Sequence, residues 1–150
     1  MKTLSSITFF LFAIIFSAGA QSFTAEQYPK MIVKTVTEKF PETEDIDWRM
    51  KNNLYEVEID GPADKNTWMR FDHSGNLLAQ KEHISPAYLP ASVSDLVVQK
   101  FAGYKTVNTE KMQTEGKTYY QVSLKGRGGK SENLVFTEKG ELTNEILFWN

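Results

Sequence analysis

Residues 28–40 read YPKMIVKTVTEKF and residues 89–101 read LPASVSDLVVQKF, so the chain uses one local pattern twice. The two copies stay aligned at an offset of 61 residues here, and of 65 residues further along. The landmarks that coincide are Pro29 and Pro90, Lys39-Phe40 and Lys100-Phe101, Tyr55 and Tyr120, Val57 and Val122, Phe71 and Phe136, Gly75 and Gly140, and Leu77 and Leu142. A repeat of about 55 to 60 residues indicates one supersecondary unit that is used twice, rather than a solenoid turn.

The first 20 residues have the anatomy of a secretory signal peptide. Lys2 precedes the apolar run ITFFLFAIIF at residues 7–16, and residues 17–20 offer a small-residue cleavage site. This run is shorter than the about 20 apolar residues that a membrane-spanning helix needs. We therefore expect an exported chain, periplasmic or secreted, with no membrane span after cleavage. The predicted organisation is a signal peptide at residues 1–20, a first repeat at 21–83, a linker at 84–88 and a second repeat at 89–150.

The amino-acid composition argues against several classes of function. The chain has 150 residues, no cysteine and a net charge of −2. The lack of cysteine excludes disulfides and thiolate chemistry. This near-neutral charge does not indicate the basic surface that proteins use to bind nucleic acid. The length fits one domain, or two small interdependent halves.

Each copy is predicted to begin with a short helix, at residues 29–39 and 90–100. A proline stands at the predicted first helical position, where its missing N–H costs nothing. Apolar residues recur every four positions and form one stripe, at Ile32, Val36 and Phe40 in the first copy and at Val93, Val97 and Phe101 in the second. Helices this short must dock against other structure to be stable.

Four antiparallel strands are predicted after each helix, at residues 46–50, 54–60, 67–71 and 76–82, and at 107–113, 119–125, 133–136 and 142–149. Tight turns are predicted at Asn52-Asn53, residues 72–75, Glu115-Gly116 and residues 138–140, since Asn and Gly tolerate a positive φ. The predicted fold class is α+β, with a tandem repeat of a helix and a four-stranded meander. Joining the halves edge to edge would give one eight-stranded sheet with both helices on one face.

These landmarks resemble the PepSY-like family of small exported proteins, which are also described as similar to the β-lactamase inhibitory protein. The first copy carries Tyr28-Pro29, Lys39-Phe40-Pro41, Trp48, Tyr55-Glu56-Val57-Glu58 and Phe71-Asp72-x-x-Gly75. The second carries Leu89-Pro90, Lys100-Phe101, Tyr119-Tyr120-Gln121-Val122 and Phe136-x-x-x-Gly140, and it lacks the tryptophan.

The resemblance implies the tandem helix–meander fold, an exported setting and a binding role. Related PepSY domains occur in propeptides of thermolysin-type metallopeptidases, where they are thought to restrain the enzyme. The β-lactamase inhibitory protein binds its target through a concave sheet. The shared motif residues are core and turn positions, so no binding site transfers residue by residue.

The sequence contains few residues that fit a catalytic site or a metal-binding site. His73 and His83 are the two histidines, they lie at opposite ends of one predicted strand, and no HExxH motif is present. The acidic residues 42–47 lack the spacing of a calcium loop. The loop GRGGK at residues 126–130 is interpreted as a hairpin loop rather than an anion cradle. We predict no catalytic residue, no metal site and no cofactor, so the chain is not expected to be an enzyme.

The sheet face away from the helices is the candidate binding surface. Strand alternation assigns to it several aromatic and charged side chains, where a face open to water should be mostly polar. Aromatic residues with arginine are common anchors of protein interfaces. The predicted binding residues are Glu56, Glu58, Trp68, Arg70, Tyr119, Gln121 and Trp149.

The sequence therefore favours a non-enzymatic exported module that binds a protein or peptide through this face. One alternative is a regulator or inhibitor of a secreted peptidase or hydrolase. Another is an envelope protein that binds a small ligand or a metal. The apolar run at residues 146–149 also makes self-association a possible use of the surface.

Overall fold

The computed structural model describes residues 22–43, 45–61 and 65–144. Two α-helices and one antiparallel sheet form the fold, which is of the α+β class. The helices are α1 (Lys30–Lys39) and α2 (Ala91–Lys100). The strands are β1 (Ser22–Phe23), β2 (Ile46–Lys51), β3 (Leu54–Ile59), β4 (Thr67–Phe71), β5 (Leu77–His83), β6 (Lys105–Thr114), β7 (Lys117–Lys125) and β8 (Ser131–Thr137), and they pair in this order across the sheet.

Seven of the predicted strands are present, as β2–β8. The predicted strand at residues 142–149 lies mostly outside the described residues, apart from an isolated bridge between Leu142 and Phe136. The two-residue β1, which pairs with β2, was not predicted from the sequence. A segment this short carries too little alternation to be recognised in a sequence.

The predicted start of each helix is wrong by one residue. Pro29 and Pro90 are N-cap residues with extended ψ angles of 132° and 145°, and the helices begin at the next residue. The carbonyl groups of the two prolines accept hydrogen bonds of 2.9 Å from the N–H groups of Ile32 and Val93. Each proline therefore still closes the first turn of its helix, but from outside it.

The first half buries its apolar residues between α1 and one face of β2–β4. Ile32 and Val36 of α1 are fully buried, at the spacing that the sequence predicted. The buried cluster comprises Tyr28, Ile32, Val36, Trp48, Val57, Ile59, Met69 and Phe71, with Tyr55 partly buried against it. Burial of apolar area on this scale is the main stabilising contribution to the half.

The second half buries its apolar residues between α2 and the strands β7 and β8. Val93 is fully buried, and Val97 and Phe101 pack half-buried against the same cluster. The buried residues of this cluster are Val93, Tyr120, Val122, Leu124 and Phe136. The apolar stripes predicted for the two helices lie in or against these clusters, with Ile32, Val36 and Phe40 in the first and Val93, Val97 and Phe101 in the second.

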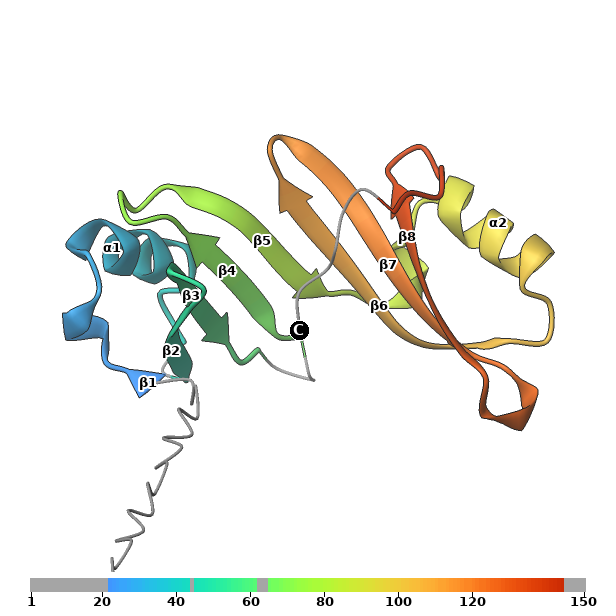
Figure 1. Ribbon diagram of the computed structural model, residues 1–150, viewed down its shortest axis with the longest axis horizontal. Helices are drawn as coiled ribbons and strands as arrows, with labels where there is room; N and C mark the ends of the chain where they lie inside the picture. The colour runs from blue at the N-terminus through green and yellow to red at the C-terminus, as the bar shows by residue number, and fades with distance from the viewer. Residues whose placement is uncertain (1–21, 44, 62–64, 145–150) are drawn as a thin grey trace, which may run out of the picture.

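The strand register places both helices on the same face of the sheet. Directly paired residues share a face, and Ile59, Thr67, Glu82, Lys111, Tyr120 and Phe136 are paired in succession across β3–β8. Ile59 belongs to the core under α1 and Phe136 to the core under α2. The two halves meet where β5 pairs with β6, and Figure 1 shows one helix beside each end of the sheet.

A hairpin glycine packs against the first turn of the helix in each half. Gly75 (φ 83°) lies against Met31 of α1, and Gly140 (φ 84°) lies against Ser92 of α2. Both glycines need the left-handed conformation that β-carbon-bearing residues rarely adopt. Met31 and Ser92 are equivalent positions at the sequence offset of 61, so corresponding residues make corresponding contacts.

Candidate binding face

We call the sheet face opposite the two helices the open face. Its centre is one row of directly paired residues that crosses both halves of the molecule. This central row contains Glu58, Trp68, Lys81, Met112 and Tyr119, on β3, β4, β5, β6 and β7. Adjacent strands are about 4.8 Å apart, so Trp68 and Tyr119 lie roughly 14 Å from each other along the row.

Trp68 is held in place by two neighbours on β5. The Nζ atom of Lys81 lies 4.3 Å from the centroid of the indole ring, in cation–π geometry. The imidazole of His83 packs edge-on against the same ring, with 5.1 Å between centroids. The indole is half-buried, so part of its surface remains accessible to solvent.

A buried ion pair joins the two halves beneath Trp68. Nζ of Lys81 lies 3.2 Å from Oε1 of Glu110, with 4% and 5% of these side chains exposed. Gln121 donates a hydrogen bond of 2.9 Å from Nε2 to the other oxygen of Glu110. Nε2 of His83 also lies 3.4 Å from Oε1 of the same carboxylate. Glu110 is therefore the shared acceptor of groups from β5 and β7.

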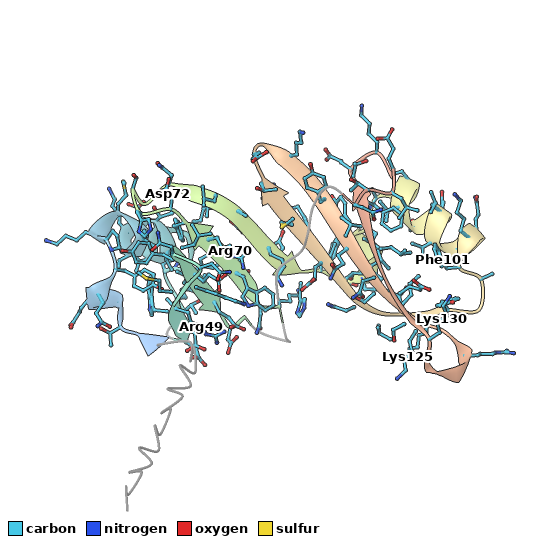
Figure 2. All side chains as sticks on the ribbon, in the orientation of Figure 1. Arg49, Arg70, Asp72, Phe101, Lys125 and Lys130 are labelled. Atoms are coloured by element: carbon cyan, nitrogen blue, oxygen red, sulfur yellow. The ribbon has the colours of Figure 1, made fainter. Side chains whose placement is uncertain are left out.

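Two further ion pairs line the first half of the open face. Nε and Nη2 of Arg70 both lie 2.5 Å from Oε1 of Glu56. Nη2 of Arg49 lies 2.9 Å from Oε2 of Glu58. Figure 2 shows Arg49 and Arg70 in the same half of the molecule. The charges on this face are largely compensated by each other, which suits contact with an uncharged partner surface.

The structure brings most of the predicted binding residues together. Glu56, Glu58, Trp68, Arg70 and Gln121 lie on the open face, as strand alternation indicated. Tyr119 lies on the same face, but the expectation that it is open to solvent is wrong, because only 6% of the residue is exposed. Trp149 lies outside the described residues.

Several residues of the face were missed by sequence reasoning. Lys81, His83, Glu110 and Met112 complete the centre of the open face. The alternation signal alone would have assigned them to this side of β5 and β6. Their contact depends on the pairing of β5 with β6, which joins residues nearly 30 positions apart and has no local sequence signal.

A shallow hollow lies at one end of the row, beside Tyr119. It has a volume of about 430 Å³ and lies between the β6–β7 turn and the turn that follows β8. Lys117, Lys139, Glu138 and Glu141 surround it with both signs of charge. This hollow extends the open face toward the tip of the second half.

The other sequence features have structural explanations. His73 is exposed and its ring packs 5.7 Å from that of Tyr55. The loop Gly126–Lys130 closes with a hydrogen bond of 2.7 Å between its ends, and Lys130 pairs with Glu132 at 2.8 Å. In Figure 2, Lys125 and Lys130 lie at the far end of the second half from Arg70. This loop is therefore remote from the centre of the open face.

Neither metal ligands nor a membrane span is evident in the part of the chain that the structure describes. No group of three or more His, Asp or Glu side chains within residues 22–43, 45–61 and 65–144 is arranged to hold a metal ion. No helix among these residues has the length and apolar character needed to cross a membrane. Among the described residues, the open face offers the half-buried ring of Trp68 between paired charges.

The chain matches no family model and no curated protein by sequence. Its fold is similar to that of a DUF2874 family protein from Bacteroides ovatus, with a TM-score of 0.66 and 14% identity over 77% of this chain and 84% of the other. It is also similar to a BLIP-like protein from Bacteroides fragilis, with a TM-score of 0.64 and 20% identity over 79% and 85% of the two chains. A candidate periplasmic protein from Bacteroides eggerthii gives a TM-score of 0.65 and 17% identity over 77% and 85%. At these identities the similarity shows a shared fold.

Proposed function

We propose that this chain is an exported, non-enzymatic module that binds a protein or peptide through its open face. The observation that carries the proposal is the half-buried indole of Trp68 in the central row, which Lys81 and His83 hold in place. Aromatic side chains beside an arginine are common energetic anchors of protein interfaces. The row spans both halves, so the surface exists only when the halves are joined.

The arrangement of charge supports binding over catalysis. Glu110 accepts from Lys81 and Gln121, and Glu56 is engaged by Arg70. A general acid or base needs access to a substrate proton, and these carboxylates are instead engaged by neighbouring side chains. Their role is to position Trp68 and to fix the register of β5 against β6.

The proposal also includes export of the chain from the cytoplasm and duplication of one structural unit within it. The signal-like sequence at residues 1–20 supports transfer out of the cytoplasm, and one structural neighbour is described as a candidate periplasmic protein. The matching contacts of Gly75 and Gly140 support a duplicated PepSY-like unit at residues 21–83 and 89–150. In this view the linker at 84–88 lets the two units share one sheet.

A capture experiment tests the binding role. The immobilised mature chain, incubated with envelope extract of its source cell, should retain a partner that Trp68→Ala no longer retains. Tyr88→Ala is the matched control, because Tyr88 is an aromatic residue that is 71% exposed in the linker between the halves. Equal retention by both variants, with both folded by circular dichroism, would show that the open face is not the binding site.

Regulation of a secreted hydrolase is the second candidate function. The observation that favours it is the fold similarity to a BLIP-like protein. The purified chain should then inhibit an exported β-lactamase or peptidase in a steady-state assay, and Trp68→Ala should weaken that inhibition. If capture succeeds and no captured enzyme is inhibited, the chain acts as an adaptor. A native mass measurement that detects a bound small molecule or metal would instead favour the envelope ligand-binding alternative.

A further inference from the structure

We propose that one end of the second half binds the surface of an anionic lipid bilayer. Four cations gather at the end where the loop between β7 and β8 projects (Figure 1), and we call them the basic cluster: Lys105, Lys125, Arg127 and Lys130. They come from the start of β6, the end of β7 and the loop before β8. In Figure 2 this cluster lies at the far end of the molecule from Arg70, so the inference does not rest on the function proposed above.

The first argument is a pair of like charges. Lys105 and Lys125 lie directly opposite each other on β6 and β7, and both are exposed. Like charges at directly paired positions destabilise a sheet. Neither lysine forms an ion pair with any residue of 22–43, 45–61 or 65–144. The pair is therefore unfavourable in the free chain, and a bound anion between the two ammonium groups would relieve the repulsion.

The second argument is the absence of carboxylates beside this pair on the described part of the sheet. The paired row continues from Lys125 to Ser131 on β8. The next row on the same face is polar and uncharged, and contains Asn108, Ser123 and Asn133. Glu132, the acidic residue of β8, is paired with the core residue Leu124 and so belongs to the helix-covered face. An anion that approaches the two lysines along the sheet thus meets no neighbouring negative charge there.

The third argument is the fixed shape of the loop that carries Arg127. The N–H group of Gly126 donates a hydrogen bond of 2.7 Å to the carbonyl of Lys130. The ring of Tyr104 packs so closely on Gly126 that a Cβ atom there would lie 2.8 Å from it. Glu132 pairs with Lys130 at 2.8 Å and so compensates one cation of the cluster. Arg127 is exposed at the outer part of the loop and projects from this fixed base.

A bilayer fits the basic cluster better than a soluble anion does. Gly128 and Gly129 have nothing within 4 Å of the positions that their Cβ atoms would take, so the loop projects into solvent. Val107, in the bulge beside Lys105, is 54% exposed. Attraction of Lys and Arg to anionic headgroups, together with burial of apolar side chains at the interface, binds peripheral proteins to bilayers. A soluble polyanion would satisfy the cations but would give the valine no apolar contact.

The expected binding is reversible and depends on salt. Each lysine or arginine beside an anionic bilayer strengthens binding about fivefold. Together, Lys105, Lys125 and Arg127 would strengthen it on the order of a hundredfold. This attraction falls off within a Debye length, which is about 8 Å at physiological ionic strength. The second half would thus rest on the membrane surface while the first half stays away from it.

Co-sedimentation of the full mature chain with lipid vesicles tests the inference. One set of vesicles contains phosphatidylcholine alone, and the other contains phosphatidylcholine mixed with phosphatidylglycerol. We expect binding to the mixed vesicles only, and we expect it to weaken as the salt concentration rises. The variant Lys125→Gln/Arg127→Gln should bind the mixed vesicles about 30-fold more weakly, because two cations of the cluster are lost.

The matched control is Lys30→Gln/Lys34→Gln. These two lysines are exposed on α1 in the first half, and their loss changes the net charge by the same amount. This variant should bind the mixed vesicles as the unchanged protein does. Trp68→Ala should also bind them normally, which separates this inference from the proposed function. Circular dichroism verifies that all three variants are folded.

Several results would overturn the inference. Failure to bind the mixed vesicles, or equal binding to both sets, would exclude recognition of anionic headgroups. Equal losses in the two double variants would mean that net charge, rather than the basic cluster, governs binding. Binding to dextran sulfate without binding to vesicles would assign the cluster to a soluble polyanion. Displacement from the vesicles by inorganic phosphate, but not by chloride at equal ionic strength, would assign it to free phosphate.

Discussion

Nζ of Lys81 lies 4.3 Å from the centre of the Trp68 ring and 3.2 Å from the carboxylate of Glu110. Lys81 belongs to β5 and Glu110 to β6, so this one ammonium group links the tryptophan of the first half to the second half. A charge this buried is stable only while its partners remain in place. The contact between the two halves and the candidate binding face therefore share Lys81 and its partners.

Loss of one member of the buried pair should be costly. Lys81→Met leaves the carboxylate of Glu110 without its ammonium partner, and we expect the free energy of unfolding to fall by about 3–5 kcal/mol. Urea denaturation of the variant measures this change. The double variant Lys81→Met/Glu110→Leu should recover most of the loss. If the single and double variants are equally destabilised, the pair does not behave as a coupled buried ion pair.

The two tryptophans of the first half should respond differently to truncation. Trp48 is buried against α1, so Trp48→Ala should cost about 3–5 kcal/mol of stability. Trp68 is half-buried on the open face, and Trp68→Ala should leave a folded protein with a clearly smaller loss. Thermal unfolding followed by circular dichroism compares them. A Trp68→Ala variant that unfolds would show that this side chain is core, which removes the proposed interface.

The hairpin glycine of the second half should tolerate no side chain. A Cβ atom at Gly140 would lie 2.6 Å from the backbone oxygen of Ser92, and its φ is +84°. We expect Gly140→Ala to destabilise the protein by about 2–4 kcal/mol, from strain in φ and from overpacking. Chemical denaturation gives the value.

Gly103→Ala provides the matched control for this prediction. Gly103 also has a positive φ, of +91°, but nothing lies within 4 Å of the position that its Cβ would take. It should show only the backbone cost of about 1–2 kcal/mol. Equal losses at Gly103 and Gly140 would show that the close approach to α2 contributes nothing.

The turn between β4 and β5 should add a pH-dependent contribution to stability. The carboxylate of Asp72 accepts hydrogen bonds of 2.9 Å from both the side chain and the backbone N–H of Asn76. These bonds, that of the side chain above all, hold the pKa of Asp72 below its ordinary value. Because the folded pKa is lowered, the contribution is present above the unfolded pKa, about 3.9, and is lost as the pH falls through the folded pKa.

Asn76→Ala should therefore raise the pKa of Asp72 toward the ordinary range. A ¹³C NMR titration of the carboxyl group in the two proteins measures the change directly. Asn133→Ala, at an exposed site on β8, should leave the titration curve of Asp72 as it is. An unchanged pKa in Asn76→Ala would mean that the side-chain hydrogen bond is not what lowers it.

Local features of the sequence predicted most of the fold. Alternation placed Val57 and Phe136 on the helix-covered face, where both are fully buried. Turn chemistry located the β2–β3 turn, where Asn52 and Asn53 have φ angles of 51° and 64°. These signals are local, because side-chain alternation and positive φ depend on adjacent residues.

The centre of the candidate site depends on long-range contacts that no local pattern encodes. Glu110 meets Lys81 only because β6 pairs with β5 in one particular register. Tyr119 was assigned to the correct face, but it is buried, and alternation does not report how far a residue is exposed. Alternation thus identified the face of each residue, and the structure was needed to show which residues of that face are accessible.

The most direct test of the binding face is side-chain footprinting of the mature chain with and without its captured partner. The proposed interface predicts that oxidation of Trp68 falls sharply in the complex. Tyr88 and Met31 should oxidise at the same rate in both states, because Tyr88 belongs to the linker between the halves and Met31 to α1, and neither is on a strand of the open face. Protection of Met31 or Tyr88 in the complex, with Trp68 unaffected, would contradict the proposed interface.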